Sequence, residues 1–436
     1  MRRWKERPMK YVICVLVAAA TISADAELRA GAARVSITPS EANLPIPLGG
    51  YGARDGKLAE GVHDTLYAKA LVFDQDGKKS ALVALDVCSL PHCVVEESLA
   101  KAKLEGLTAD TVMMVASHSH TGLEGMALDR RNVADNPHIG IFSEPLLNFV
   151  TDRVAQVLGE ANVALQPVTA AAGVVALPGM NRNRRKDTFI DEDLTLLRLD
   201  AAGGRPYAIL VNFTAHGTIV SEREMLASAE WAGSMQRTVE ALLGEGVTCF
   251  YTNGAEGDMS PAGARGASAW ERFEDYGRRV GIAAARLAGA LQTRPAQTFA
   301  FQCRWVDLPP KKGAPDFVKI AGDEYHVTQE QLDQLLPALF PDRAQVMALR
   351  VNDFQMVTFP GEPICQFGLT LKRQMREAGI KYPCVAALTN DSIGYILTKE
   401  EYAESGYEVT ASFYGDGLGA LMLENAGAVA QSAAGE

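Results

Sequence analysis

The chain has 436 residues, 47% of them hydrophobic, which allows one large α/β domain or two to three ordinary domains. Its formal net charge is −11, and it has no long basic run and no interleaved basic and aromatic residues, so nothing in its charge favours nucleic acid as a partner. Six of its seven cysteines follow residue 80. They are too few for a disulfide scaffold and lack the C-x-x-C spacing of a metal site, so buried free thiols are at least as well expected as disulfides.

The N-terminus has the pattern of a secretory signal peptide. Residues 1–10 are basic, residues 11–23 are apolar, and Ala24-Asp25-Ala26 satisfies the small-x-small rule for cleavage. The apolar run is too short to span a bilayer, and no later run is long enough to do so. We therefore expect residues 1–26 to be removed and residues 27–436 to be a soluble protein that is secreted or periplasmic.

Between residues 33 and 106 the pattern of apolar residues predicts a strand at 33–39, a hairpin of strands 66–73 and 80–86, and a helix at about 91–106. Between the first two strands lies Gly49-Gly50-Tyr51-Gly52. Its glycines either form a simple turn, which we favour, or let the backbone approach a ligand.

The next apolar run, which starts at Val112, breaks into Ser117-His118-Ser119-His120-Thr121-Gly122. Strand, helix and strand in this order predict a right-handed βαβ unit, and ligands of α/β proteins bind at the carboxyl ends of strands. On an extended chain His118 and His120 would point to the same side, which is a good start for a zinc site. The alternative is that these histidines are merely half-buried at the end of a strand.

Two later strands end in the same way. The strand at 208–214 leads into His216, and the strand at 247–251 opens into a glycine-containing loop with Asp258 and Ser260, a possible base and hydroxyl. A single histidine at a strand end is more often structural, but two strands that each end in a histidine favour a shared site.

The rest of the chain is predicted to alternate helices with strands. Glu362 stands at the start of a predicted helix, where it either serves a site or caps the helix. The basic stretch 179–186 is expected to be a solvated loop, and the charged stretch 309–329 an excursion on the surface. The remaining predicted elements are helices at 144–164, 230–243, 270–290, 363–378 and 416–431 and strands at 297–307, 347–351, 354–359 and 385–389.

An ordered set of motifs from about Gly31 to the end of the chain resembles the catalytic domain of the neutral, non-lysosomal ceramidase family. Each motif alone is weak, but together and in this order they are specific. The motifs are Ser-His-Ser-His-Thr-Gly at 117–122, Met-Asn-Arg at 180–182, Asn-Phe-Thr-Ala-His at 212–216, Gly-Asp-Met-Ser-Pro at 257–261, Pro-Gly-Glu at 360–362, and Tyr-Ile-Leu-Thr at 395–398 with Tyr407 beyond it.

The resemblance implies a zinc-dependent amidohydrolase with a mixed β-sheet core, flanking helices and an active site at the strand ends. It implies that zinc is bound by four ligands and that Ser260 is essential, either as a nucleophile or as a hydroxyl that positions water at the zinc. Three further residues would line the same pocket. The ligands are His118, His216, Glu362 and Tyr395, and the pocket residues are His120, Arg182 and Tyr407.

Two departures from the family pattern concern the substrate. The sequence stops soon after Tyr407, so we expect one catalytic domain at 27–436 without the usual C-terminal immunoglobulin-like domain, and 123–126 replaces a glycine-rich run. The substrate is therefore expected to be ceramide or a related N-acyl compound, small or lipid-like. The alternatives are a zinc-dependent esterase or deacetylase acting on a carbohydrate, and an inactive binding protein with the same fold. The sequence does not determine the oligomeric state.

Overall fold

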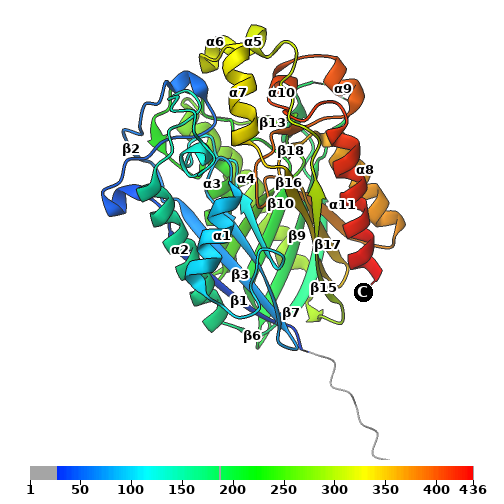
Figure 1. Cartoon of the computed structure of the whole chain (residues 1–436). Helices are drawn as coiled ribbons and strands as arrows, with labels where there is room; N and C mark the ends of the chain where they lie inside the picture. The colour runs from blue at the N-terminus through cyan, green and yellow to red at the C-terminus, as the bar shows by residue number, and fades with distance from the viewer. Residues whose placement is uncertain (1–26, 186–187, 436) are drawn as a thin grey trace, which may run out of the picture.

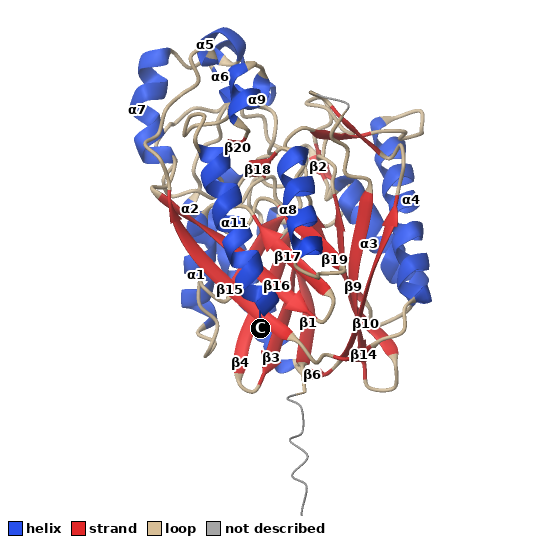
Figure 2. Ribbon diagram, turned by 90° about the vertical axis from the view of Figure 1, so that its right-hand side faces the viewer, coloured by secondary structure: helices blue, strands red, loops and turns tan. Residues whose placement is uncertain are grey.

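The computed structural model describes residues 27–185 and 188–435, so the predicted signal peptide lies outside the described residues. Three larger β-sheets, each covered by helices on its outer face, form the body of the described chain, and three two-stranded sheets accompany them (Figures 1 and 2). None of the described helices is long and apolar enough to cross a bilayer. All six cysteines in the described residues are free thiols, as the apolar surroundings of several of them suggested.

The first sheet has the strand order β5-β4-β3-β1-β6. β3 and β4 form the predicted hairpin. β4 and β5 pair in parallel and are connected through α1, which confirms the predicted strand–helix–strand unit. Its elements are β1 (Arg29–Ser36), β3 (Tyr67–Gln75), β4 (Lys78–Leu85), α1 (His92–Ala102), β5 (Val112–Ala116), α2 (Glu144–Val163) and β6 (Gln166–Pro167).

The second sheet, in the order β12-β10-β9-β7-β14, repeats this arrangement with α3 between the parallel strands β10 and β12. Its elements are β7 (Thr169–Ala176), β9 (Asp193–Ala201), β10 (Arg205–Phe213), α3 (Glu230–Leu243), β12 (Thr248–Asn253), α4 (Ala269–Ala290) and β14 (Arg294–Pro295).

The third sheet, in the order β15-β16-β17-β19, also contains one parallel pair, β17 and β19, joined through α8. β16 and β17 form the hairpin predicted across Asn352-Asp353. Its elements are β15 (Phe299–Asp307), β16 (Arg343–Val351), β17 (Phe354–Thr358), α8 (Cys365–Glu377), β19 (Tyr382–Ala386) and α11 (Leu418–Gly435).

The three sheets share a hydrophobic core. Phe73 and Met113 of the first sheet, Phe250 of the second, and Met347 and Met356 of the third belong to one buried cluster. The outer faces of the sheets are closed by their helices in three further clusters. Strands that are buried on both faces consist almost entirely of apolar residues, which is why they could be recognised from the sequence.

Some expectations differ from the structure. The basic stretch 179–186 is not simply a solvated loop. It contains β8 (Asn181–Asn183), which pairs with β13 (Met259–Pro261). The charged excursion also contains the short helices α5 (Phe317–Ile320) and α6 (Gly322–Tyr325), and α7 (Gln329–Leu339) follows it. Phe317, Leu332 and Leu336 of these helices are buried, whereas Val318 and Ile320 are 39% and 40% exposed. None of the charged residues of this stretch is buried.

Short elements complete the described chain. Among them, β18 (Glu362–Pro363) pairs in parallel with β20 (Tyr395–Ile396), so Glu362 precedes the helix instead of starting it. The others are η1 (Pro39–Ala42), η2 (Gly52–Arg54), β2 (Gly61–Val62), η3 (Gly125–Ala127), β11 (Leu226–Ala227), α9 (Lys399–Ala403) and α10 (Tyr407–Thr410).

A buried ion cluster fastens α8 to the second sheet. Lys372 is 1% exposed and donates to Asp191 (2.7 Å) and Asp193 (3.0 Å). Burial alone would lower the pKa of Lys372, but the two carboxylates raise it above its ordinary value, so the ammonium stays charged. Asp191 also accepts from the Thr214 hydroxyl, next to the end of β10.

We therefore predict that Lys372→Met lowers the free energy of unfolding by about 3–5 kcal/mol, because it leaves the buried carboxylate of Asp191 without a cation. Arg376→Met is the matched control. It removes an ion pair to Asp193 from a side chain that is 47% exposed, and should cost less than about 1 kcal/mol. Urea unfolding of the two variants measures the difference, and equal losses would contradict the importance of the buried cluster.

Candidate functional site

Each of the three sheets sends one side chain to a common point beyond its strand ends. His118 follows β5, His216 follows β10, and Glu362 follows β17. Glu362 Oε2 lies 3.4 Å from His118 Nε2 and 3.3 Å from His216 Nε2, and one ligand atom from each residue lies within 4.8 Å of the others. All three side chains are buried, with 5%, 1% and 12% of their surfaces exposed. These residues come from distant parts of the sequence, so the fold creates the cluster.

Hydrogen bonds on the far side of both imidazoles fix their tautomers. His118 Nδ1 lies 2.7 Å from the Cys88 carbonyl, and His216 Nδ1 lies 2.8 Å from the Glu256 carbonyl. Because a carbonyl only accepts, both Nδ1 atoms must carry a proton, so Nε2 is the atom of each ring that faces Glu362. This is the arrangement in which metal-binding histidines are held in proteins. Burial alone would lower the pKa of His118, but Glu362 raises it well above its ordinary value, so a bound metal ion would have to displace the Nε2 proton of this ring.

The spacing of the cluster fits a small tetrahedral metal ion. Nitrogen and oxygen ligands at about 2.0–2.1 Å from zinc lie about 3.3–3.4 Å from one another. The two distances from Glu362 have this value, as does the 3.4 Å between Tyr395 Oη and His216 Nε2. Glu362 Oε2 also has no hydrogen-bond partner among the described residues, although it is buried. A divalent cation at the centre would satisfy it.

Cys88 offers a competing set of ligands with His118 and His120. Two observations disfavour it. The Nδ1 atom of His118, which is the ring nitrogen nearer to the thiol (3.9 Å), already donates to a carbonyl. Cysteine also binds metals as the thiolate, whereas burial raises the pKa of the Cys88 thiol above its ordinary value. The set with His216 and Glu362 is therefore preferred.

Charge within the cluster is balanced by the carboxylate. Burial alone would raise the pKa of Glu362, but His118 and His216 lower it well below its ordinary value. Burial and the charge of Arg184 lower the pKa of His216 to about 4, so this ring is neutral at physiological pH. Burial and Glu362 together raise the pKa of the Tyr395 phenol.

The two histidines of the Ser-His-Ser-His motif do meet, but not because the chain is extended. His118 has a φ of +61°, a left-handed conformation that costs a non-glycine residue roughly 1–2 kcal/mol. His120 Nε2 nevertheless lies 3.2 Å from His118 Nε2, and His120 Nδ1 is buried without a partner among the described residues. The prediction that His118 and His120 lie together is therefore correct, but the extended backbone from which it was inferred is wrong.

The glycine loop makes close approaches as well as a turn. A Cβ atom at Gly50 would lie 2.3 Å from the ring of His120, and one at Gly49 would lie 2.3 Å from the Cβ of Cys88. Arg54 holds the same loop. Its buried guanidinium donates to the carbonyls of Gly49 (2.6 Å) and His120 (2.7 Å). The sequence showed the glycines but not the function of Arg54, which depends on contacts across 66 residues.

Gly50→Ala should consequently displace His120. Gly50 has a φ of +89°, so alanine adds both backbone strain and overlap with the ring. Gly77→Ala is the control, since Gly77 has a φ of +78° but no atom within 4 Å of an added Cβ. We expect the control to cost about 1–2 kcal/mol and Gly50→Ala to cost a further 1–3 kcal/mol in urea unfolding. Equal costs would show that the loop can move away from His120.

Arg184 is a residue of the site that the sequence analysis did not identify. Its Nη2 donates to Tyr395 Oη (3.0 Å) and to the Gly257 carbonyl (2.7 Å), while its Nε donates to Glu408 (2.7 Å). It lay in the basic stretch that was expected to be solvated. The only available signal was the presence of arginines beside the Met-Asn-Arg motif in an acidic protein.

Ser260 and Arg182 lie opposite each other in the β13–β8 pair. In the described part of the chain neither side chain forms a hydrogen bond with the two histidines or Glu362. Ser260 is connected to the cluster through its neighbour Met259, whose carbonyl accepts from the backbone N–H of His216 (3.0 Å). Their assignments accordingly remain predictions.

Asp258 and Glu362 have exchanged the roles that their positions suggested. Asp258 accepts from the Cys365 N–H (2.7 Å) at the start of α8 and from Asn183 Nδ2 (2.7 Å). It therefore caps the helix, and its carboxylate is occupied by these bonds instead of being free to act as a base. Glu362, for which capping was the alternative, points to the histidines.

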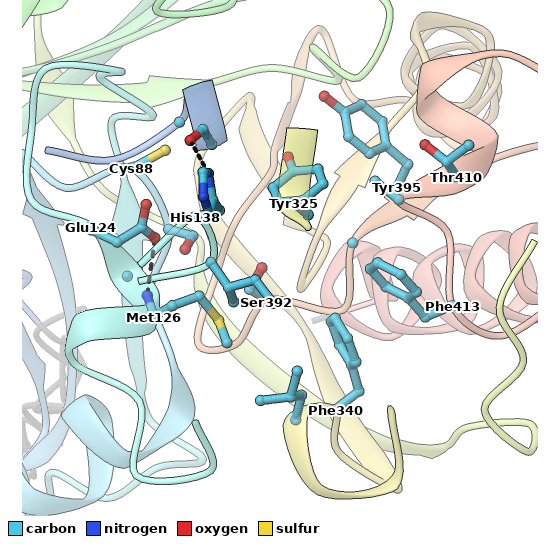
Figure 3. A pocket seen from close by; sticks show the side chains of 18 of the residues that line it. Cys88, Glu124, Met126, His138, Tyr325, Phe340, Ser392, Tyr395, Thr410 and Phe413 are labelled. Atoms are coloured by element: carbon cyan, nitrogen blue, oxygen red, sulfur yellow. Dashed lines mark hydrogen bonds between the residues drawn. The ribbon is translucent and has the colours of Figure 1, made fainter. Parts of the chain in front are cut away.

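A cavity of about 240 Å³ opens beside the cluster. His118, His120, Glu362, Tyr395 and Tyr407 line one part of it, which has the polar groups. In Figure 3, Phe340 and Phe413 face the same space as Tyr325 and Tyr395. The phenol oxygens of Tyr325 and Tyr407 lie 3.2 Å apart. The arrangement is typical of a site that binds an apolar molecule with one polar group.

Fold and geometry thus define a mixed α/β protein with a candidate metal site at the meeting point of three strand ends. Residues 29–272 match the family model for neutral/alkaline non-lysosomal ceramidases, N-terminal region. The match covers more than half of the chain, which therefore belongs to this family, as the ordered motifs indicated.

Known relatives cover most of the chain. The neutral ceramidase of Mycobacterium tuberculosis is 24% identical over 460 residues, which include 84% of this chain and 71% of that protein. The neutral ceramidase of Pseudomonas aeruginosa is 22% identical, with coverages of 92% and 72%. The crystal structure of a neutral ceramidase from Pseudomonas aeruginosa superposes with a TM-score of 0.77 at 20% identity, over 94% of this chain and 75% of that one. This similarity confirms the mixed α/β fold.

Proposed function

We propose that the protein is a zinc-dependent amidohydrolase that cleaves the N-acyl amide bond of ceramide or a related N-acyl compound. The observation that carries the proposal is the convergence of His118 Nε2, His216 Nε2 and Glu362 Oε2 beside an apolar cavity. The names of the relatives, all neutral ceramidases, support the substrate class.

The residues of this chain would divide the work as follows. His118, His216, Glu362 and Tyr395 would hold the ion, which when bound polarises the amide carbonyl and makes water a stronger nucleophile. Ser260 would attack the carbonyl carbon or orient the attacking water, and Arg182 would steady the negative charge that forms on the oxygen.

Two further groups would act at the cavity. Tyr407 lines it with its phenol oxygen 3.2 Å from that of Tyr325, and a tyrosine phenol keeps its proton at physiological pH, so it can donate a hydrogen bond. His120 would accept or donate a proton at Nε2, the ring atom that lies 3.2 Å from His118 Nε2. The apolar walls favour an acyl chain over the carbohydrate of the alternative reading, because sugar hydroxyls would lose their hydrogen bonds to water there.

The first test is the metal content of the purified protein, measured together with hydrolysis of a fluorescent N-acyl sphingosine. We expect about one zinc per chain and turnover, and loss of both in His118→Ala and in His216→Ala, because each variant removes one of three converging ligands. His92→Ala, a histidine on α1 outside the cluster, is the control and should keep both. Full activity in a zinc-free variant would refute the metal assignment.

Arg184→Met tests whether the arginine orients Tyr395. We expect kcat to fall by about 10–100-fold, as is typical when a partner of a metal ligand is removed. Arg185→Met is the matched control, because Arg185 also binds Glu408 (2.8 Å) but has no hydrogen bond to Tyr395. A purely structural role would reduce kcat equally in both variants, whereas our account predicts a change of less than about threefold for Arg185→Met.

We also propose that the protein is exported by its signal peptide and acts outside the cytoplasm. The basic, apolar and small-x-small segments of residues 1–26 support this.

A further inference from the structure

The apolar wall of the cavity comes mainly from one segment, residues 317–340, inserted between β15 and β16. In Figures 1 and 2 its helices lie beyond the strand ends, at the end of the molecule where the candidate metal centre is found. The residues of this segment that line the cavity are Phe317, Tyr325, Val327, Leu332, Leu335, Leu336, Leu339 and Phe340. Apart from the phenol oxygen of Tyr325, their side chains are apolar.

Within this segment, α7 has two apolar edges with different contacts. The helix is fixed at its start by a capping box between Thr328 and Gln331. Leu332 and Leu336 belong to the hydrophobic core of the third sheet. Leu335 and Leu339, four residues apart and hence on the same side of the helix, line the cavity without being part of that core.

Aromatic rings line the cavity beyond the end of α7. Phe340, directly after α7, packs on Phe413 with ring centroids 4.2 Å apart. Of the proposed metal ligands Figure 3 labels Tyr395, which lies away from Phe340 across the space that both residues line. A molecule whose amide is at the metal centre would therefore extend its apolar chain along α7 towards the two phenylalanines.

We propose that α7 selects the length of the acyl chain, with Leu335 and Leu339 as the specificity-determining residues. This inference rests on the proposed amide hydrolysis and adds a limit to it. A protein cavity of about 150 Å³ holds benzene, so 240 Å³ has room for about ten carbon atoms. The enclosed part of the site thus takes one chain of at most about ten carbons, and further carbons protrude into water.

Binding of primary n-alkanamides, from butanamide to tetradecanamide, to the full-length protein tests the inference without any turnover. In calorimetric titrations, the wild-type affinity should rise by up to about fourfold per methylene group and level off near ten carbons. Leu339→Trp should move this limit to shorter chains and weaken decanamide binding at least tenfold. Leu335→Ala should move it to longer chains. The larger side chain at 339 fills part of the cavity, and the smaller one at 335 enlarges it.

Ala338→Trp is the matched control, because Ala338 lies on the same helix but is exposed and is not among the residues that line the cavity. It should leave the chain-length profile unchanged. The inference is overturned if Leu335→Ala and Leu339→Trp both keep the wild-type limit, if Ala338→Trp shifts it equally, or if no alkanamide binds.

Hydrolysis of N-acyl sphingosines with the same acyl lengths, by the zinc-loaded protein, separates this inference from the proposed function. Profiles of kcat/KM that shift with the variants as binding does support both. A shift in alkanamide binding without hydrolysis of any N-acyl compound keeps α7 as the chain-binding wall and refutes the amidohydrolase.

Discussion

Two backbone carbonyls determine what the centre of this protein can bind. By accepting the Nδ1 protons of His118 and His216, the carbonyls of Cys88 and Glu256 turn both Nε2 atoms towards Glu362. If either ring carried its proton on Nε2 instead, that N–H would point into the centre and repel a cation. The chemistry therefore depends on main-chain positions, which the loops after β4 and β12 must hold to within a few tenths of an ångström.

The fold achieves this precision by joining the three sheets close to the site. Asn212 of β10 donates to the Val385 carbonyl of β19 (2.7 Å), which links the second and third sheets. Asn390 donates to the Val112 carbonyl (2.8 Å) and accepts from the Met114 N–H (2.7 Å), which links the third sheet to β5. Buried amides of this kind are costly unless fully paired, so they favour one arrangement of the sheets over shifted ones.

The strands could be predicted from the sequence, because strands buried on both faces are long apolar runs that end in polar residues. The same pattern predicted that the site lies at the carboxyl ends of these strands. His118 and His216 could be located in this way. Glu362 could not be distinguished from a helix cap, since the choice depends on whether Asp258, 104 residues earlier, occupies that cap. Tyr395 was placed only by resemblance to the family.

Other parts of the site could not be predicted for the same physical reason. Arg54, Arg184 and the leucines of α7 act through contacts with residues far away in the chain, and their local sequence resembles that of ordinary surface segments. The left-handed backbone of His118 is likewise imposed by its surroundings, because nothing in a Ser-His-Ser-His sequence favours it.

X-ray absorption spectroscopy at the zinc edge of the reconstituted protein tests the central claim most directly. If His118, His216, Glu362 and Tyr395 bind the ion, the spectrum will show only nitrogen and oxygen neighbours at about 2.0–2.1 Å, with the outer scattering of two imidazoles. A sulfur neighbour at about 2.3 Å would instead place the metal at Cys88, and absence of imidazole scattering would show that the two histidines do not bind it.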